Sequence, residues 1–197
     1  MQHIVTLPIL TFDERVLSPR FGYVFQRRWL QPYESVVGML WKFARMNGLP
    51  GHTVAAQLSP KDADPYEGFE LAEVDVPRVA RLLGVTQRSV RAGIGRAQVD
   101  CSPHLRFCPK CIGLGYHGRA QQLLRHARCP IHGKPLQAAC RRCERPSPYR
   151  LDAQLLDAPF KCRHCRAPYA LQSTPAIPAR WALATPERAA ITRASMA

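Results

Sequence analysis

Four pairs of potential metal ligands follow one another between residues 108 and 165. Within each pair two residues separate the ligands, which is the spacing at which one tight turn directs both side chains at a single ion. The pairs are Cys108/Cys111, Cys129/His132, Cys140/Cys143 and Cys162/Cys165. One pair supplies only half of a tetrahedral shell, so each pair needs a second pair to close it.

The lengths of the intervening stretches favour one way of combining the pairs. The 17 residues of 112–128 and the 18 residues of 144–161 suit two consecutive ribbon-like fingers, each with one zinc ion. The first site would consist of Cys108, Cys111, Cys129 and His132, and the second of Cys140, Cys143, Cys162 and Cys165. An interleaved arrangement, in which the first pair joins the third, is the alternative, and it requires longer loops.

The eight cysteines of the chain could instead form four disulfides, as they would in a secreted protein. However, the first residues, MQHIVTLPILTFDER, lack the basic segment and long apolar run of a signal peptide. No window approaches 18 apolar residues, so we expect no membrane span and a cytoplasmic location. In that reducing compartment CxxC pairs favour a metal over disulfides. Cys101 lies outside the pattern and is expected to be a plain thiol.

The charge of the chain is concentrated around the ligand pairs. Residues 101–170 carry 13 Lys/Arg against 3 Asp/Glu, whereas residues 1–100 carry 12 against 10. Seven thiolates and two Zn²⁺ would lower the formal charge of +14 to roughly +11. A surface this basic suits a polyanion such as DNA or RNA, and the exposed candidates beside the third ligand pair are Arg141, Arg142 and Arg145. The alternative is a merely soluble, Arg-rich protein.

Upstream of the ligand pairs the sequence predicts helices. From residue 33, Val36, Leu40 and Phe43 recur at helical spacing until Asn47-Gly48, a good C-terminal stop. Residues 52–58 predict one or two further helical turns. The acidic stretch 61–75 contains Pro and Gly and predicts an exposed loop, either a solvated linker or a contact surface for a basic partner.

Residues 76–96 resemble a helix-turn-helix. Ala80 would lie where two helices touch, Gly84 at the turn, Thr86 at the N-cap of the second helix and Val90 in its buried face. The side chains that would then point outward are Gln87, Arg88 and Arg91. In a DNA-binding protein such residues contact bases or phosphates. The alternative is a compact helical hairpin with a solvated basic face.

The N-terminal arm is unusually rich in aromatic residues, namely Phe21, Tyr23, Phe25 and Trp29. We predict that these residues anchor a protein partner, because aromatic side chains dominate the energetics of many interfaces. The alternative is that they simply cover the helix predicted over residues 33–47.

These elements predict a mainly α fold with small zinc-ribbon β elements. Three parts follow along the chain: an arm and helical domain (1–100), a tandem zinc-finger domain (101–170) and a C-terminal tail (171–197) in which residues 186–195 could form a short helix. Complete protein shells leave no position for a reacting water, so both zinc ions would be structural. The sequence contains no general-base constellation, Gly-rich phosphate loop or triad of acidic ligands, and we therefore expect a protein without catalytic activity.

Several phrases of the sequence occur together in a known combination. They are PYES at 32–35, opening a helix that closes at 47–48, the helix-turn-helix-like 76–96, FCPKC at 107–111, and CPIHGKPL at 129–136 followed by Cys140 and Cys143. With these phrases the chain resembles the TniQ family of transposition adaptors, which includes the N-terminal part of TnsD proteins. The phrase CPxHGxxL running into CxxC is the most specific of them.

The resemblance implies an adaptor without chemistry of its own. Such a protein links a DNA target, or in some relatives an RNA-guided targeting complex, to an AAA+ transposition ATPase of the TnsC/TniB type. The alternative function is a transcription regulator that uses the helix-turn-helix and the zinc ribbons on operator DNA. A zinc-dependent nucleic-acid enzyme is a third class, but it would need an open metal position or an acidic cluster.

Overall fold

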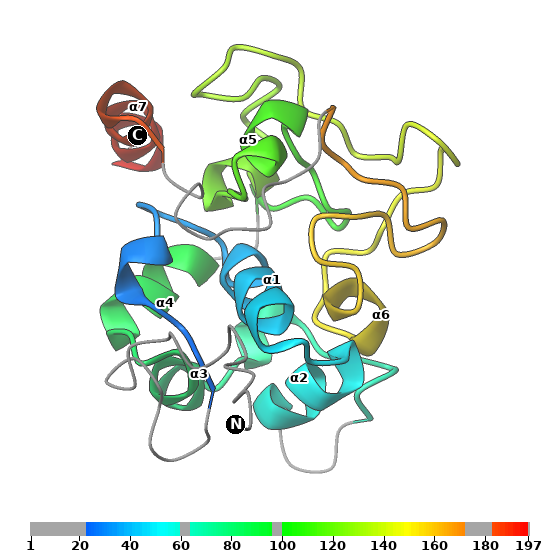
Figure 1. Ribbon diagram of the computed structural model, residues 1–197. Helices are drawn as coiled ribbons and strands as arrows, with labels where there is room; N and C mark the ends of the chain where they lie inside the picture. Colours follow the sequence, from blue (N-terminus) through cyan, green and yellow to red (C-terminus); the bar gives the residue numbers. More distant parts are fainter. Residues whose placement is uncertain (1–22, 60–63, 96–99, 172–182, 197) are drawn as a thin grey trace, which may run out of the picture.

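The computed structural model describes residues 23–59, 64–95, 100–171 and 183–196 (Figure 1). Short helices dominate it, and β structure among these residues consists of isolated bridges. The helices are η3 (Arg27–Trp29), α1 (Val36–Asn47), α2 (Gly51–Leu58), η4 (Leu71–Glu73), α3 (Val76–Leu83), α4 (Gln87–Ile94), α5 (Pro109–Gly113), η6 (Arg119–Gln122), α6 (Ala153–Leu156) and α7 (Thr185–Met196). The prediction of a mainly helical chain with little β structure is confirmed.

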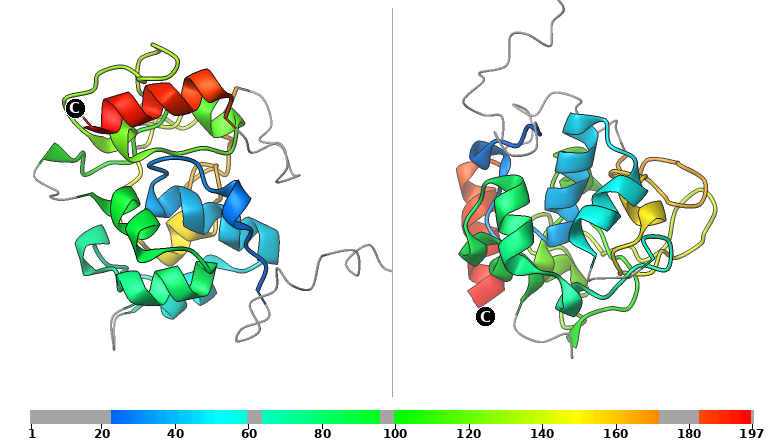
Figure 2. Two further views of the ribbon diagram at one scale, coloured as in Figure 1. Left: turned by 90° about the vertical axis from the view of Figure 1, so that its left-hand side faces the viewer. Right: turned by 90° about the horizontal axis from the view of Figure 1, so that it is seen from below.

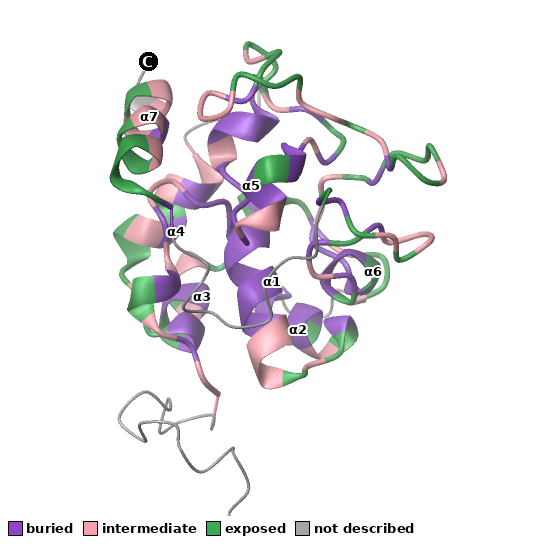
Figure 3. Ribbon diagram, turned by 45° about the horizontal axis from the view of Figure 1, so that its top comes forward, coloured by how far each residue is buried: buried purple, intermediate pink, exposed green. Residues whose placement is uncertain are grey.

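Helix α1 lies at the centre of the molecule, with α4 on one side and α6 on the other (Figure 1). Its residues from Val36 to Ala44 are buried on every face, as the purple ribbon in Figure 3 shows. The Ser35 side chain caps its N-terminus, so the helix begins at Val36 and not at residue 33. Gly48 ends the helix in the left-handed conformation, as the sequence predicted. Because α1 is buried on all sides, it packs both against the other helices of residues 23–95 and against the segment of residues 100–171 that carries the ligand pairs.

One contact between those two parts is the packing of α2 against α6. A β-carbon added at Gly51 would lie 2.0 Å from the carbonyl oxygen of Ala153, so only glycine permits this approach. From α1, the Trp41 indole donates a hydrogen bond of 2.8 Å to the carbonyl oxygen of Leu155. The hydrophobic core consequently continues from Phe25 in the arm to Ala170 beyond the last ligand pair.

Helices α3 and α4 form a compact pair. Asp75 caps α3, Gly84 ends it with a positive φ of 61°, and Thr86 caps α4 by accepting from the Ser89 amide. Val90 is fully buried, and Ala80 is 5% exposed. Each local feature follows from a residue with the appropriate capping or turn preference, which explains why the sequence located both helices.

The acidic stretch is less free than an exposed loop. Residues 61–63 lie outside the described ranges. The carboxylates from residue 64 to 75 face solvent, but Phe69 and Leu71 are buried, and the Phe69 backbone pairs with that of Leu151. Buried side chains likewise attach the N-terminal arm to the core. Phe25 is 7% and Trp29 3% exposed, and the Tyr23 ring packs edge-on against Phe43.

Two charged residues, Glu34 just before α1 and Lys42 in the middle of that helix, are buried against each other. The Lys42 ammonium lies 2.8 Å from Oε1 and 2.9 Å from Oε2 of Glu34, and both side chains are 0% exposed. Lys42 also donates to the Trp29 carbonyl oxygen, at 2.7 Å. Burial raises the pKa of Glu34 and lowers that of Lys42, while each partner opposes the shift of the other. The pair therefore holds the arm to α1 only as long as both members are present.

A buried polar network joins α1 to the ligand-bearing segment. The Ser35 hydroxyl lies 2.5 Å from Nδ1 of His117, whose Nε2 donates to the carbonyl oxygen of Arg106 at 2.9 Å. Gln122 donates to the same carbonyl oxygen. The neutral imidazole thus uses both nitrogens, and burial lowers the pKa of His117 to about 4.

We expect this histidine to make the fold sensitive to acid. Its folded-state pKa of about 4 lies below the unfolded value of about 6.5, so the unfolded chain binds more protons between these values. Stability is complete above pH 6.5 and falls by up to about 3 kcal/mol as the pH drops to 4. Urea unfolding at several pH values should show a shallower decline for His117→Gln. Equal declines in both proteins would contradict this assignment, since acid release of metal affects both alike.

Candidate metal centres

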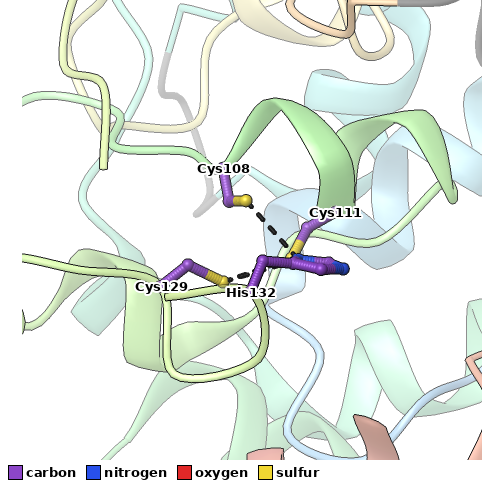
Figure 4. Close-up of side chains that lie close together, drawn as sticks. All are labelled: Cys108, Cys111, Cys129 and His132. Carbon is purple, nitrogen blue, oxygen red and sulfur yellow. Dashed lines mark hydrogen bonds between the residues drawn. The ribbon is translucent and has the colours of Figure 1, made fainter. Parts of the chain in front are cut away.

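The first cluster joins the first two ligand pairs. Cys108 is the N-cap of α5 and Cys111 lies in its first turn, and Cys129 and His132 lie on a tight turn that faces them (Figure 4). The sulfurs of Cys111 and Cys129 are 3.6 Å apart. Nδ1 of His132 lies 3.6, 3.3 and 3.8 Å from the sulfurs of Cys108, Cys111 and Cys129, respectively.

The second cluster joins the last two ligand pairs and contains only cysteines. The sulfurs of Cys140 and Cys165 are 3.6 Å apart, and those of Cys143 and Cys162 are 3.7 Å apart. In each cluster one ligand atom per residue lies within 4.8 Å of all the others. The sequential combination of pairs is therefore confirmed, and the interleaved alternative does not occur.

The distances match those around a tetrahedral zinc ion. Zn–S bonds of about 2.3 Å and Zn–N bonds of about 2.0 Å place two sulfurs about 3.8 Å apart and a sulfur and a nitrogen about 3.6 Å apart. A disulfide requires sulfurs about 2.05 Å apart, and all the cysteines are free. The two clusters could thus hold two zinc ions, with four protein ligands each.

Three of the four ligand pairs share one backbone design. Single β-bridges close eight-residue loops around them, at Arg128–Pro135, Ala139–Pro146 and Lys161–Pro168. In every loop the residue after the second ligand has a positive φ, namely Gly133 at 62°, Glu144 at 57° and Arg166 at 60°. The first cysteine of each loop accepts the amide of that residue through its carbonyl oxygen. The remaining pair, Cys108/Cys111, differs because Cys108 is the N-cap of α5 and Cys111 lies within that helix.

The surroundings of the sulfurs suit thiolates bound to a cation. In the second cluster the amides of Arg142 and His164 each approach a sulfur, of Cys140 and Cys162, at 3.4 Å. In the first cluster, hydrogen bonds with Cys111 and Cys129 hold the pKa of Cys108 far below its usual range, whereas those with Cys108 and Cys129 raise the pKa of Cys111 well above it. Thiols this close to one another compete for protons, and a Zn²⁺ ion would replace those protons with one cation that all the sulfurs share.

The C-terminal helix covers the first cluster. Leu183 and Ile191 are 5% and 1% exposed and pack with the three cysteines. Nε2 of His132, the ring nitrogen that faces away from the sulfurs, lies 3.3 Å from Oε1 of Glu187. Figure 2 shows α7 crossing this part of the molecule. The sequence predicted a short helix at 186–195 but offered no sign of where it would dock.

The residues predicted to contact nucleic acid form two separate groups, one on α4 and one on the third ligand loop. Gln87, Arg88 and Arg91 are exposed on α4, as predicted, and Arg91 donates to Gln87. Arg141, Arg142 and Arg145 are exposed on the third ligand loop, on the opposite side of α1 (Figure 1). Arg141 also donates to the Ala170 carbonyl oxygen, so it has a structural contact as well.

Two of the four aromatic residues that were predicted to anchor a partner are buried and not exposed. Phe25 and Trp29 lie in the core, where a partner cannot reach them in this conformation, and Tyr23 is half-buried. Phe21 lies outside the described residues. This packing is the one expected if the arm covers helix α1.

Comparison with known proteins adds no further assignment. No model of a protein family matches the chain, and no curated protein matches it. Within the described ranges, no helix is both long and apolar enough to cross a membrane.

Proposed function

We propose that this chain is a TniQ-type adaptor for DNA transposition, stabilised by two structural zinc ions and without catalytic activity. It would link a DNA target, or an RNA-guided targeting complex, to an AAA+ transposition ATPase of the TnsC/TniB type. The observation that carries the proposal is the phrase CPIHGKPL at 129–136, whose Cys129 and His132 complete a four-ligand shell. This phrase and its continuation into Cys140 and Cys143 are the most specific part of the TniQ resemblance.

The chemistry of the clusters supports a role carried by contacts. Four protein ligands per cluster leave no position for a water nucleophile, which a catalytic zinc site needs. The one close serine–histidine pair described above, Ser35 and His117, is fully buried, so no substrate reaches it. Any role in transposition would therefore consist of binding other molecules and holding them together, and not of catalysing a reaction.

The proposed DNA contacts lie on two basic surfaces. On α4, Gln87, Arg88 and Arg91 would face the DNA in a helix-turn-helix mode, supported by the compact α3–α4 pair. On the third ligand loop, Arg141, Arg142 and Arg145 would meet phosphates. A nucleic acid could approach both surfaces, because all six side chains are at exposed positions, although Arg91 donates to Gln87 and Arg141 donates to the Ala170 carbonyl oxygen.

The adaptor role is tested by a pull-down with an AAA+ transposition ATPase of the TnsC/TniB type from the same source. We expect the tagged protein to retain the ATPase, and to retain more of it when DNA is present. Bovine serum albumin carrying the same tag is the control for nonspecific retention. Absence of retention with and without DNA would contradict the adaptor role.

DNA binding is expected to be weak, largely nonspecific and sensitive to salt. Changing Arg141, Arg142 and Arg145 together to Gln should flatten the slope of log affinity against log salt by about three units, if each contacts one phosphate. Fluorescence anisotropy with a duplex at several salt concentrations measures the slope. The matched variant R88Q/R91Q should flatten it by about two units if α4 also lies on DNA. Unchanged slopes in folded variants would assign these surfaces to a protein partner or to solvent.

The α3–α4 pair also supports the second candidate, a transcription regulator. A regulator would bind one operator sequence tightly without any ATPase. Selection of bound sequences from a random duplex library separates the two functions, because an enriched motif favours the regulator and its absence favours the adaptor.

A further inference from the structure

We propose that Glu187 is a positioning residue of the first cluster, and that its contact with His132 couples metal binding there to the docking of helix α7. The inference rests on the proposed zinc ion but not on the role in transposition. No ligand pattern in the sequence includes Glu187, which lies 55 residues after His132.

The His132 ring lies between the sulfurs of the cluster and the carboxylate of Glu187. Its Nδ1 faces the three sulfurs at 3.3 to 3.8 Å, and its Nε2 faces Oε1 of Glu187 at 3.3 Å. An imidazole that gives the lone pair of Nδ1 to a metal carries its proton on Nε2. A carboxylate that accepts this proton in a hydrogen bond fixes the tautomer and the ring orientation and makes the ligand more basic.

The carboxylate is itself held in place. Its second oxygen, Oε2, accepts the Ala184 amide at 2.7 Å, at the start of α7. One turn further on, Ile191 is buried among the cysteines of the cluster, and Arg188 donates to the Gln31 side chain at 3.1 Å. Glu187 can therefore reach His132 only while α7 is docked.

The expected effect is on metal affinity and not on general stability. The side chains of His132 and Glu187 are 13% and 26% exposed, and an ion pair this close to solvent contributes little by itself. Loss of a carboxylate that orients a metal-bound histidine typically weakens metal binding 10- to 100-fold. The second cluster has no histidine and so provides an internal control.

The coupling must act in both directions. If docking of α7 tightens zinc binding by some factor, zinc tightens the docking of α7 by the same factor. An empty first cluster should therefore leave residues 185–196 less protected, whereas an empty second cluster should not.

Zinc competition with a chromogenic chelator tests the first direction. We expect Glu187→Ala to weaken one of the two ions 10- to 100-fold and to leave the other unchanged. Glu187→Gln keeps one acceptor oxygen, which can still accept from Nε2 of His132 although the second oxygen is lost, and it should lose less. Arg193→Ala, at an exposed position of the same helix, is the matched control and should bind zinc as the wild type does.

Cobalt substitution shows whether the effect is on the ligand itself. The ligand-field bands of the Cys₃His cluster should shift in Glu187→Ala and return towards wild type in Glu187→Gln, which a purely structural loss would not produce. Hydrogen exchange tests the second direction: amides of 185–196 should exchange faster in Cys129→Ser than in Cys162→Ser.

The outcomes separate the inference from the zinc proposal. A wild-type protein without zinc in the first cluster would overturn both. Two bound ions with equal affinities in the wild type and Glu187→Ala would overturn the role of Glu187 alone. Equal exchange of α7 in the two cysteine variants would overturn the coupling.

Discussion

Replacing Cys129 or Cys162 with serine is expected to remove one zinc ion from the protein and to unfold the surroundings of the lost site. Structural zinc contributes on the order of 10–16 kcal/mol in finger peptides, which equals or exceeds the 5–15 kcal/mol stability of a typical domain. No remaining contact can offset such a loss in a segment without extended strands. Elemental analysis should therefore find one ion per chain in each variant and two in the wild type.

The two variants should differ in what they disrupt. Cys162 belongs to the main core, together with Phe160 and the residues of α6, whereas Cys129 packs in the smaller cluster beneath α7. We expect Cys162→Ser to lower the unfolding temperature more. Cys101→Ser, outside both clusters, is the control and should keep two ions. A zinc-free wild type, or four disulfides found by mass spectrometry, would contradict the assignment.

Changing Lys42 to Met is expected to destabilise the protein by about 3–5 kcal/mol, because the Glu34 carboxylate would remain buried without its cation. For a chain of this size such a loss lowers the unfolding temperature by roughly 6–20 °C. Differential scanning calorimetry measures it. Arg28→Met, which removes an exposed cation from the same arm, should change the temperature little.

The double variant Glu34→Gln/Lys42→Met tests whether the pair acts as a unit. Removing both charges eliminates the unpaired buried ion, so the double variant should be more stable than Lys42→Met alone. Additive losses from the two single changes would show that the residues act independently and would contradict the burial argument.

The sequence by itself determined the features that arise from neighbouring residues. A spacing of three positions between ligands is enough to predict a tight turn, and three of the four turns repeat the same bridge and the same positive φ. Caps such as Ser35 and Thr86, and the stop at Gly48, act within one helical turn. The sequential grouping of ligand pairs also followed from local information, because the shorter loops cost less entropy to close.

Only the tertiary structure decided which distant groups meet. Ser35 and His117 are 82 residues apart, and Trp41 and Leu155 are 114 apart, so no spacing rule joins them. Lys42 would be expected at a surface position, yet the packing of the arm over α1 buries it beside Glu34.

The same distinction applies to the candidate sites. The eight ligands were predictable because metal coordination demands particular residue types at short spacings. The contact of Glu187 with His132 was not, since any exposed acid on any helix could have supplied that carboxylate. Docking of α7, through Leu183 and Ile191 packed against the cluster, selected this one. Short-range geometry is encoded residue by residue, whereas such a contact depends on how every intervening element packs.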